Sequence, residues 1–226
     1  MSISRRAGRA RLLATALGVS VAAFALPARA QVEGYAADYC EPPAGTKLLY
    51  TNRAYEIEPK SVDEPPLYYT YKILTPSGRS QHVDRLSQFM FDDGTDQWDV
   101  ETQADQILGF WPLWPGKQLT IQRVDRQTGV TAEVTFTVLG LDPIRAGSRL
   151  HNSWKIRRID NMSNGTHFYQ FLWYAPGLCT LSAFTDSQHR LVRLLQVLEP
   201  GDRDYDRALK VKDHHLYFAD NDEMVK

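Results

Sequence analysis

The sequence predicts an all-β or β-dominated fold: a curved antiparallel meander, a half-barrel or a sandwich, ending in a short C-terminal helix. Apolar and polar residues alternate along successive short segments, as they do in antiparallel strands with one solvated face. Turn residues separate these segments, which is typical of hairpins. No helical pattern between them is long enough for βαβ units, so a parallel sheet is not expected.

The first two predicted hairpins occupy the middle of the chain. Residues 67–74 alternate, turn at residues 75–78 and return over residues 81–91. Residues 117–125 then turn into residues 130–139, the most regular of the predicted strands. One face of that strand is apolar, with Val130, Ala132, Val134, Phe136 and Val138, while threonines and a glutamate occupy the other.

Four further strands are predicted over residues 153–160, 166–174, 178–184 and 190–198. The last of these also fits helical spacing through its four leucines, but its length and the turn before it favour a strand. Residues 201–213 predict the C-terminal helix, with Asp202 as its N-cap. We expect extended loops in the proline-containing residues 41–45 and 58–66, and a frayed tail over residues 220–226.

The N-terminus has the pattern of an export signal. Four arginines precede an apolar run over residues 12–26, and Ala28 and Ala30 lie where a signal peptidase reads small residues. The run has about 15 residues, fewer than the roughly 20 that a membrane-spanning helix needs. We therefore predict cleavage near Ala30 and a single β-rich domain over residues 31–226, periplasmic or secreted. The Arg5-Arg6 pair leaves general secretory and twin-arginine export both open, with the former favoured.

Loss of residues 1–30 changes the charge of the chain. These residues contain 5 of the 26 basic residues and none of the 27 acidic ones, so the remainder has 26 − 5 = 21 basic residues and a net charge of 21 − 27 = −6. This excess of acid argues against nucleic acid or an anionic membrane surface as the main partner. In an oxidising compartment the only two cysteines, Cys40 and Cys179, are expected to form a structural disulfide.

Motifs that carry chemistry are missing from the sequence. It has no nucleophile elbow, zinc-protease motif, phosphate-binding loop or C-x-x-C pair. The adjacent His214 and His215 point in different directions on any regular element, and the acidic residues 92–96 lack the calcium-loop order and predict a turn. We therefore predict no metal, no cofactor and no catalytic residue.

Aromatic loops are the strongest local feature. Residues 110–117 place Phe110, Trp111 and Trp114 beside two prolines, and Trp173 and Tyr174 end a later strand. Such loops either plug the end of a sheet or line a ligand cleft. The plug is favoured, and Trp111, Trp114, Trp173 and Tyr174 are the candidate ligand-binding residues if a cleft forms instead.

The same segments resemble a loose family of exported bacterial β-proteins. The resemblance covers about residues 107–185: Phe110-Trp111-Pro112-Leu113 with Gly116-Lys117, then residues 144–147 with 154–156, then residues 173–177. Members of that family tend to read F-P-L-x-x-G-K, P-A-G-x-F…K-I and W-Y-A-P-G-x-G. This chain departs from them at Arg145 and Cys179, where a proline and a glycine are usual. The resemblance implies an envelope β-domain and supplies no catalytic residue.

Three functions remain open on this basis. The first, which we favour, is a non-catalytic domain that binds an envelope component or a small apolar ligand in a groove of the four aromatic residues. The second is a structural or assembly partner that docks through an exposed sheet edge. The third is a hydrolase with an unrecognised arrangement of aspartate and histidine, which is disfavoured because no nucleophile with its base can be named. The identity of the partner and the oligomeric state do not follow from the sequence.

Overall fold

A computed structural model describes residues 36–59, 68–74, 80–86, 89–92, 96–98, 100–203, 205, 209–212 and 215–218. The chain separates into two units, Met1–Glu33 and Gly34–Lys226. The first unit lies outside the described residues, together with the predicted export signal, so the description below concerns the second. No helix in the described part of the chain is long and apolar enough to cross a membrane.

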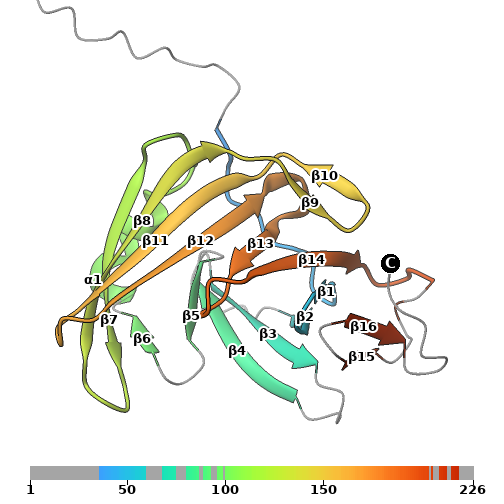
Figure 1. Cartoon of the computed structure of the whole chain (residues 1–226), viewed down its shortest axis with the longest axis horizontal. Helices are drawn as coiled ribbons and strands as arrows, with labels where there is room; N and C mark the ends of the chain where they lie inside the picture. Colours follow the sequence, from blue (N-terminus) through green and yellow to red (C-terminus); the bar gives the residue numbers. More distant parts are fainter. Residues whose placement is uncertain are drawn as a thin grey trace, which may run out of the picture. The chain divides into compact units, whose positions relative to one another are not determined.

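A curved antiparallel sheet of twelve strands forms the body of this unit, which confirms the predicted β-dominated fold (Figure 1). Its strands lie in the order β5-β4-β3-β2-β1-β14-β13-β12-β11-β8-β7-β6. The first group of strands is β1 (Lys47–Tyr50), β2 (Ala54–Ile57), β3 (Tyr68–Leu74), β4 (Ser80–Leu86) and β5 (Met90–Asp92). The second group is β6 (Asp96–Trp98), β7 (Gln118–Asp125), β8 (Thr131–Leu141), β11 (Trp154–Met162), β12 (His167–Ala175), β13 (Thr180–Thr185) and β14 (Leu191–Leu198).

The chain follows the sheet as a meander whose first and last strands pair. Within each group, neighbours in sequence are neighbours in the sheet, except that the hairpin of β9 (Ile144–Ala146) and β10 (Arg149–His151) is inserted between β8 and β11. The two groups meet where β1 pairs with β14, with Lys47 opposite Leu198. The sheet therefore ends at β5 and β6, which have three residues each.

The inner face of the sheet holds the main core. The alternation predicted for residues 130–139 places Ala132, Val134, Phe136 and Val138 on this face, and all four are buried. One buried cluster lies under β7, β8, β11 and β12, and a second lies under β1, β2, β3 and β14. Phe184 packs against both clusters, so the inner face is apolar from one group of strands to the other.

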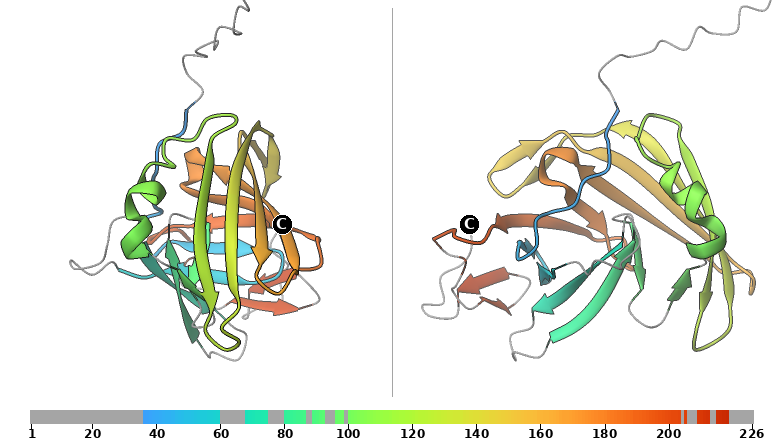
Figure 2. Two further views of the ribbon diagram at one scale, coloured as in Figure 1. Left: turned by 90° about the vertical axis from the view of Figure 1, so that its left-hand side faces the viewer. Right: turned by 180° about the vertical axis from the view of Figure 1, so that it is seen from behind.

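The only α-helix among the described residues, α1 (Val100–Leu108), was not predicted from the sequence. It lies beside β7 (Figure 2), and Ile107 is buried in the core. The Gln103 side chain accepts a hydrogen bond of 2.8 Å from the backbone N–H of Gln122. β6 pairs with β7 only from Arg123 onward. The bond to Gln103 therefore satisfies the Gln122 N–H, which β6 leaves unpaired.

The predicted C-terminal helix over residues 201–213 is wrong. Gly201, Arg203 and Tyr205 lie in turns, and β15 (Leu209–Lys212) pairs with β16 (His215–Phe218) in a separate hairpin. Asp202 accepts a hydrogen bond from the N–H of Glu199, which precedes it, and so does not cap a following helix. The Tyr205 hydroxyl donates to the carbonyl of Gly45, which ties this turn to the segment before β1. The predicted frayed tail and most of residues 58–66 lie outside the described residues.

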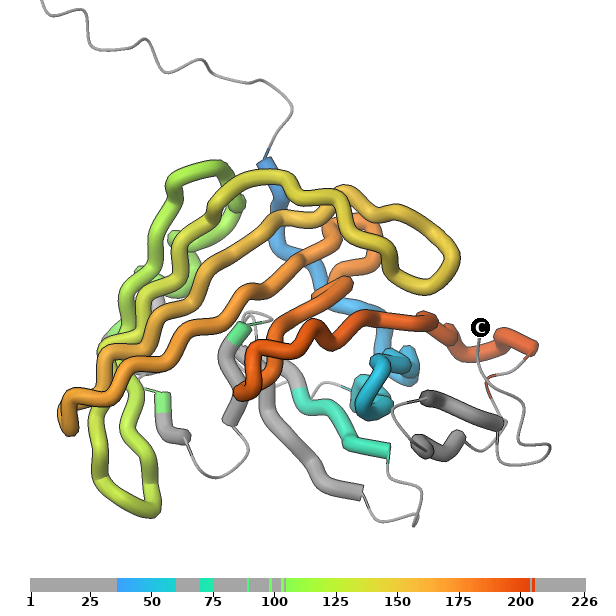
Figure 3. Tube along the Cα trace, viewed as in Figure 1, coloured from blue at the N-terminus to red at the C-terminus, as the bar shows by residue number. Residues whose placement is uncertain are grey.

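A segment before β1, blue in Figure 3, runs toward β1 from the part of the chain near Leu113. Ala37 exchanges backbone hydrogen bonds with Leu113, at 3.1 and 2.8 Å. Cys40 then forms a disulfide with Cys179, whose Cα lies 5.1 Å away, as the sequence predicted. We call residues 36–46 the N-terminal strap.

Candidate functional site

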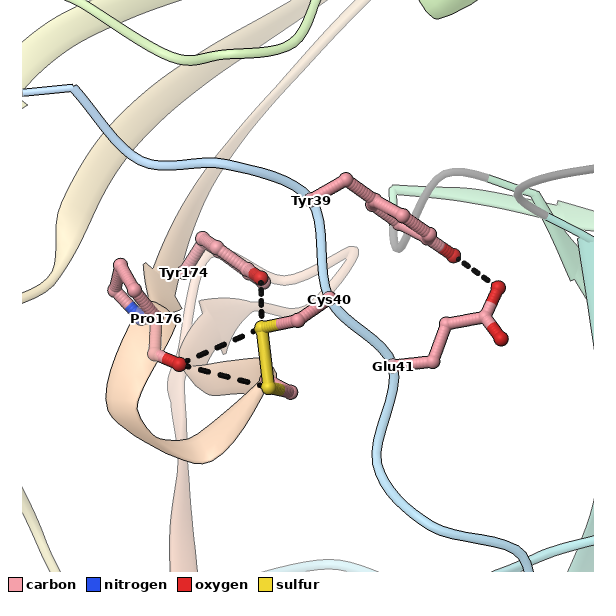
Figure 4. The surroundings of a disulfide bond; sticks show 6 residues. Tyr39, Cys40, Glu41, Tyr174 and Pro176 are labelled. Carbon is pink, nitrogen blue, oxygen red and sulfur yellow. Dashed lines mark hydrogen bonds between the residues drawn. A yellow bond between two sulfur atoms is a disulfide. The ribbon is translucent and has the colours of Figure 1, made fainter.

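Two of the four predicted aromatic residues meet inside the core, next to the disulfide. The rings of Trp111 and Tyr174 contact edge to face, with centroids 5.0 Å apart. Tyr174 is fully buried, and its hydroxyl donates to the Sγ of Cys40 at 3.0 Å (Figure 4). Trp111 is partly exposed and stacks on the buried ring of Phe89. Rings therefore fill the space between these residues, which fits the predicted plug.

Trp114 does not belong to this plug, so the expectation that it fills the core is wrong. Its side chain is 45% exposed. The ammonium group of Lys117 lies 3.6 Å from the centre of its ring and donates to the carbonyl of Pro112 at 2.9 Å. Partial burial lowers the pKa of Lys117. Lys117 therefore links two residues of the same loop, and the ring of Trp114 remains partly exposed to solvent.

Trp173 lies on the opposite face of the sheet from Tyr174, because neighbouring residues on a strand point to opposite faces. It is buried there by Ile144 of β9 and Ala183 of β13. Its indole N–H donates to Asp142 at 2.9 Å, and Lys155 pairs with the same carboxylate at 3.0 Å. The hydrogen bond from Trp173, followed by that from Lys155, lowers the pKa of Asp142.

The β9–β10 hairpin that covers Trp173 is held close to the sheet by a glycine. Gly147 has a positive φ of 58°, and a Cβ at this position would collide with the carbonyl oxygen of Leu195 on β14. Its N–H donates to the carbonyl of Leu194 at 2.9 Å. The close approach shields one end of the outer face and leaves the rest of β12 uncovered by this hairpin.

An aromatic row continues along β12 from beneath the hairpin. Phe171 lies 6.2 Å from Trp173 between ring centroids, and Tyr169 lies 6.2 Å from Phe171. Phe171 is half-buried, and Tyr169 is 49% exposed with His189 stacked on its ring at 4.2 Å. Solvent-facing positions of an antiparallel sheet usually carry polar residues, so a row of rings here calls for an explanation.

Neighbouring strands extend this surface with apolar and cationic side chains. Arg157 of β11 lies opposite Phe171, and Ile159 lies opposite Tyr169. Beyond Phe171, Thr185 of β13 pairs with Leu191 of β14, which is 38% exposed. Arg193 follows on the same face of β14. We call this surface the β12 face, made of Arg157, Ile159, Tyr169, Phe171, Leu191 and Arg193.

The β12 face carries an excess of positive charge. Two acids lie at its margins, and each is already paired: Asp142 with Lys155, and Asp186 with Arg190 at 2.8 Å. Arg157 and Arg193 have no ion pair within the described residues, and the Nε of Arg157 is buried without a hydrogen-bond partner. The four cations and two acids sum to 4 − 2 = +2. The chain without residues 1–30 has a net charge of −6, so this face has the opposite sign to the whole.

A hollow adjoins the β12 face where β1 meets β14. It has a volume of about 470 Å³ and is lined by Thr51, Asn52, Asp186, Arg190, Leu191, Val192 and Arg193. Thr51 and Arg193 are linked by two bonds, from the Thr51 N–H to the Arg193 carbonyl and from the Arg193 N–H to the Thr51 hydroxyl. The Oδ1 of Asn52 is buried and accepts no hydrogen bond. We call this hollow the β1–β14 pocket.

A buried ionic cluster on the inner face was also missed by the sequence analysis. Asp160 is fully buried and accepts hydrogen bonds from both flanking guanidinium groups: Arg158 at 2.7 Å through Nε and Nη2, and Arg123 at 3.2 and 3.0 Å. The guanidinium of Arg158 also lies over the rings of Trp98 and Phe136. With its oxygens occupied by four donors, Asp160 neutralises buried charge and has no room to act on a substrate.

The sequence contained a signal for one of these features. In the strand alternation, Arg123, Arg158 and Asp160 occupy positions in register with buried apolar residues, so charged residues on an inward face could have revealed the cluster. The β12 face could not be found in this way, because the sequence does not show which side of β12 carries the larger core.

The fold and the surface define a disulfide-linked antiparallel β-domain with an aromatic and cationic outer face. No protein-family model matches the chain, and no curated protein sequence does. Two solved structures are similar to it. A Bacteroides fragilis protein described as exported and as having a YmcC-like fold is 11% identical, with a TM-score of 0.40, over 72% of this chain and 100% of that one. The hypothetical lipoprotein YmcC of Escherichia coli K12 is 11% identical, with a TM-score of 0.38, over 71% of this chain and 89% of that one. Likenesses of this size do not bear on function.

Proposed function

We propose that the protein is an exported, non-catalytic interaction domain that binds an acidic protein partner of the cell envelope through the β12 face. The export signal predicted from the sequence and the disulfide support an oxidising compartment. The observation that carries the proposal is the row of Tyr169 and Phe171 on the outer face, with two arginines that lack ion-pair partners among the described residues. Tyrosine, tryptophan and arginine dominate the binding energy of protein interfaces.

The size of the face fits the centre of an interface. Four strands spaced by about 4.8 Å span roughly 14 Å, whereas a standard protein interface covers about 800 Å² on each partner. The β12 face therefore supplies the central anchors, and the surrounding polar strands supply the rim. Its excess of positive charge favours an acidic partner.

Three alternatives receive less support. A small apolar ligand between Trp111 and Tyr174 would have to displace rings that already contact each other. Docking through a sheet edge would use β5 or β6, and three-residue edge strands offer few backbone groups for pairing. Asp160 also offers a hydrolase no accessible carboxylate.

Site-specific photocrosslinking in living cells tests the proposal. A benzoylphenylalanine at position 169 should form crosslinks with one dominant protein, and the same group at position 118 should not. Gln118 is the matched control because it is exposed on the outer face of β7, away from the aromatic row. The crosslinked protein, once purified, should bind the wild type and lose affinity for a Tyr169→Ser, Phe171→Ser variant. Equal patterns at both positions, or crosslinks only to glycan or lipid, would contradict the proposal.

A further inference from the structure

We infer that the β1–β14 pocket recognises an acidic residue in an extended segment of the partner, by its carboxylate and its backbone N–H together. This inference rests on the proposed function, since the pocket shares Leu191 and Arg193 with the β12 face. It adds the recognition chemistry: an aspartate or glutamate next to an apolar side chain.

The pocket contains one cation that no described residue neutralises. Asp186 accepts hydrogen bonds from the N–H groups of Gln188 and Arg190 and from the Arg190 guanidinium, at 2.9 Å each, so its charge is committed to its own turn. The side chain of Arg193 has no ion pair or hydrogen bond within the described residues. Because a guanidinium group binds a carboxylate through two parallel hydrogen bonds, an acidic side chain fits this position.

The pocket also contains one acceptor that lacks a donor. Asn52 lies at the tip of the tight β1–β2 turn, which the N–H of Tyr50 closes by donating to the carbonyl of Arg53 at 2.8 Å. The turn fixes the backbone on either side of Asn52 and leaves its Oδ1 buried and unpaired. A buried acceptor without a donor costs free energy until a donor binds it.

A peptide residue supplies both missing partners at once. The carboxylate of an aspartate or glutamate pairs with Arg193, and a backbone N–H of the same segment hydrogen-bonds Asn52 when its side chain turns the buried Oδ1 toward the pocket. A free anion would satisfy only the first. Leu191 belongs to both the pocket and the β12 face, so its exposed side chain offers a contact for an apolar residue next to the acidic one.

Titration of the 15N-labelled protein, purified from exporting cells, with two short peptides tests the inference. The probes are acetyl-Phe-Glu-Phe-amide and acetyl-Phe-Gln-Phe-amide, followed through the amide signals of Thr51, Asn52 and Arg193. We expect the glutamate peptide to bind about tenfold more tightly than the glutamine peptide, as for a hydrogen bond to a charged group. Sodium acetate should move the Arg193 signals and leave the Asn52 side-chain signals unchanged.

Three variants separate the contributions. Arg193→Gln keeps the backbone bonds to Thr51 and should abolish the preference for glutamate. Asn52→Ala should weaken the peptide and leave acetate unaffected. Arg149→Gln, an exposed arginine on β10, is the control and should change neither.

Equal affinity for the two peptides would overturn the inference, and so would an Asn52 side chain that does not respond to either peptide. These measurements require no partner protein. If the peptide titration fails and crosslinking at position 169 succeeds, the inference about the pocket is contradicted and the proposed function is not. If the titration succeeds and crosslinking fails, the proposed protein partner is contradicted.

Discussion

Replacement of Asp160 should destabilise the protein more than any single change at its surface. Asp160→Asn removes the negative charge that lies between the guanidinium groups of Arg123 and Arg158, whose side chains are each only 10% exposed. Breaking a buried ion pair by removing one partner costs about 3 to 5 kcal/mol, because the remaining charge stays buried. With a urea m-value of about 3 kcal/mol/M, the unfolding midpoint should fall by about 1 to 1.7 M.

Urea denaturation followed by circular dichroism measures this loss. Glu133→Gln is the matched control, since Glu133 is exposed on the outer face of β8, and it should change stability by about 0.5 kcal/mol or less. Adding Arg158→Met to Asp160→Asn should cost less than the sum of the two single changes by about 1 kcal/mol, because each already breaks the same contact. An Asp160→Asn variant within about 1 kcal/mol of the control would refute the argument that this cluster is effectively buried.

Three further predictions follow from contacts described above. Trp111→Ala should cost about 2 to 4 kcal/mol and Trp114→Ala about 1 kcal/mol or less in urea denaturation, and equal losses would contradict the different burial of the two rings. Free-thiol titration of the denatured, unreduced protein should find none, and replacing both cysteines by serine should cost roughly 4 to 5 kcal/mol, as expected for a loop closed over a separation of 139 residues. Asp142 has a lower pKa in the folded protein, so it adds stability above the unfolded value of about 3.9, which is lost as the pH falls through the folded pKa. The melting temperatures of wild type and Asp142→Asn should therefore differ at neutral pH and converge below about pH 4, and a gap that persists there would show that the carboxylate charge is not the cause.

Local alternation was sufficient to predict most of the sheet. Residues 130–139 and 153–160 alternate because one face of each strand is buried and the other solvated, so their pattern carries both the strand and its inward face. The strand over residues 190–198, which also fitted a helix, is confirmed as β14. The strands β1 and β2 were missed because each has only four residues, which is too short for an alternating pattern to be told from a helical one.

The two errors over helices have a common physical cause. Residues 201–213 have helical spacing, but hydrogen bonds with Gly45 and Lys47 hold Tyr205 in a turn, and tertiary contacts override local propensity. The reverse holds for α1, whose apolar residues at positions 100, 104, 107 and 108 and following Gly109 are a helical signal. The helix was not predicted because the acidic residues just before it indicated a turn.

The candidate site was less predictable than the fold. Trp173 and Tyr174 are adjacent in the sequence, yet their side chains lie on opposite faces, so they could not belong to one groove. Arg193 and Asn52 line one pocket only because β1 pairs with β14, and these strands are separated by more than 100 residues in the sequence. No local pattern records such a pairing.

The pairing of the first and last strands of the sheet has a consequence for how the chain folds during synthesis. One edge of β1 pairs with β2, but the other has no strand to pair with until β14 has been made, when most of the chain is already outside the ribosome or the export channel. Contacts between such distant residues form slowly, and an unpaired edge invites association with other chains in the interval. We therefore expect yield to depend on helpers that protect β1 until the sheet is complete, and on the rate at which the strap is joined to Cys179.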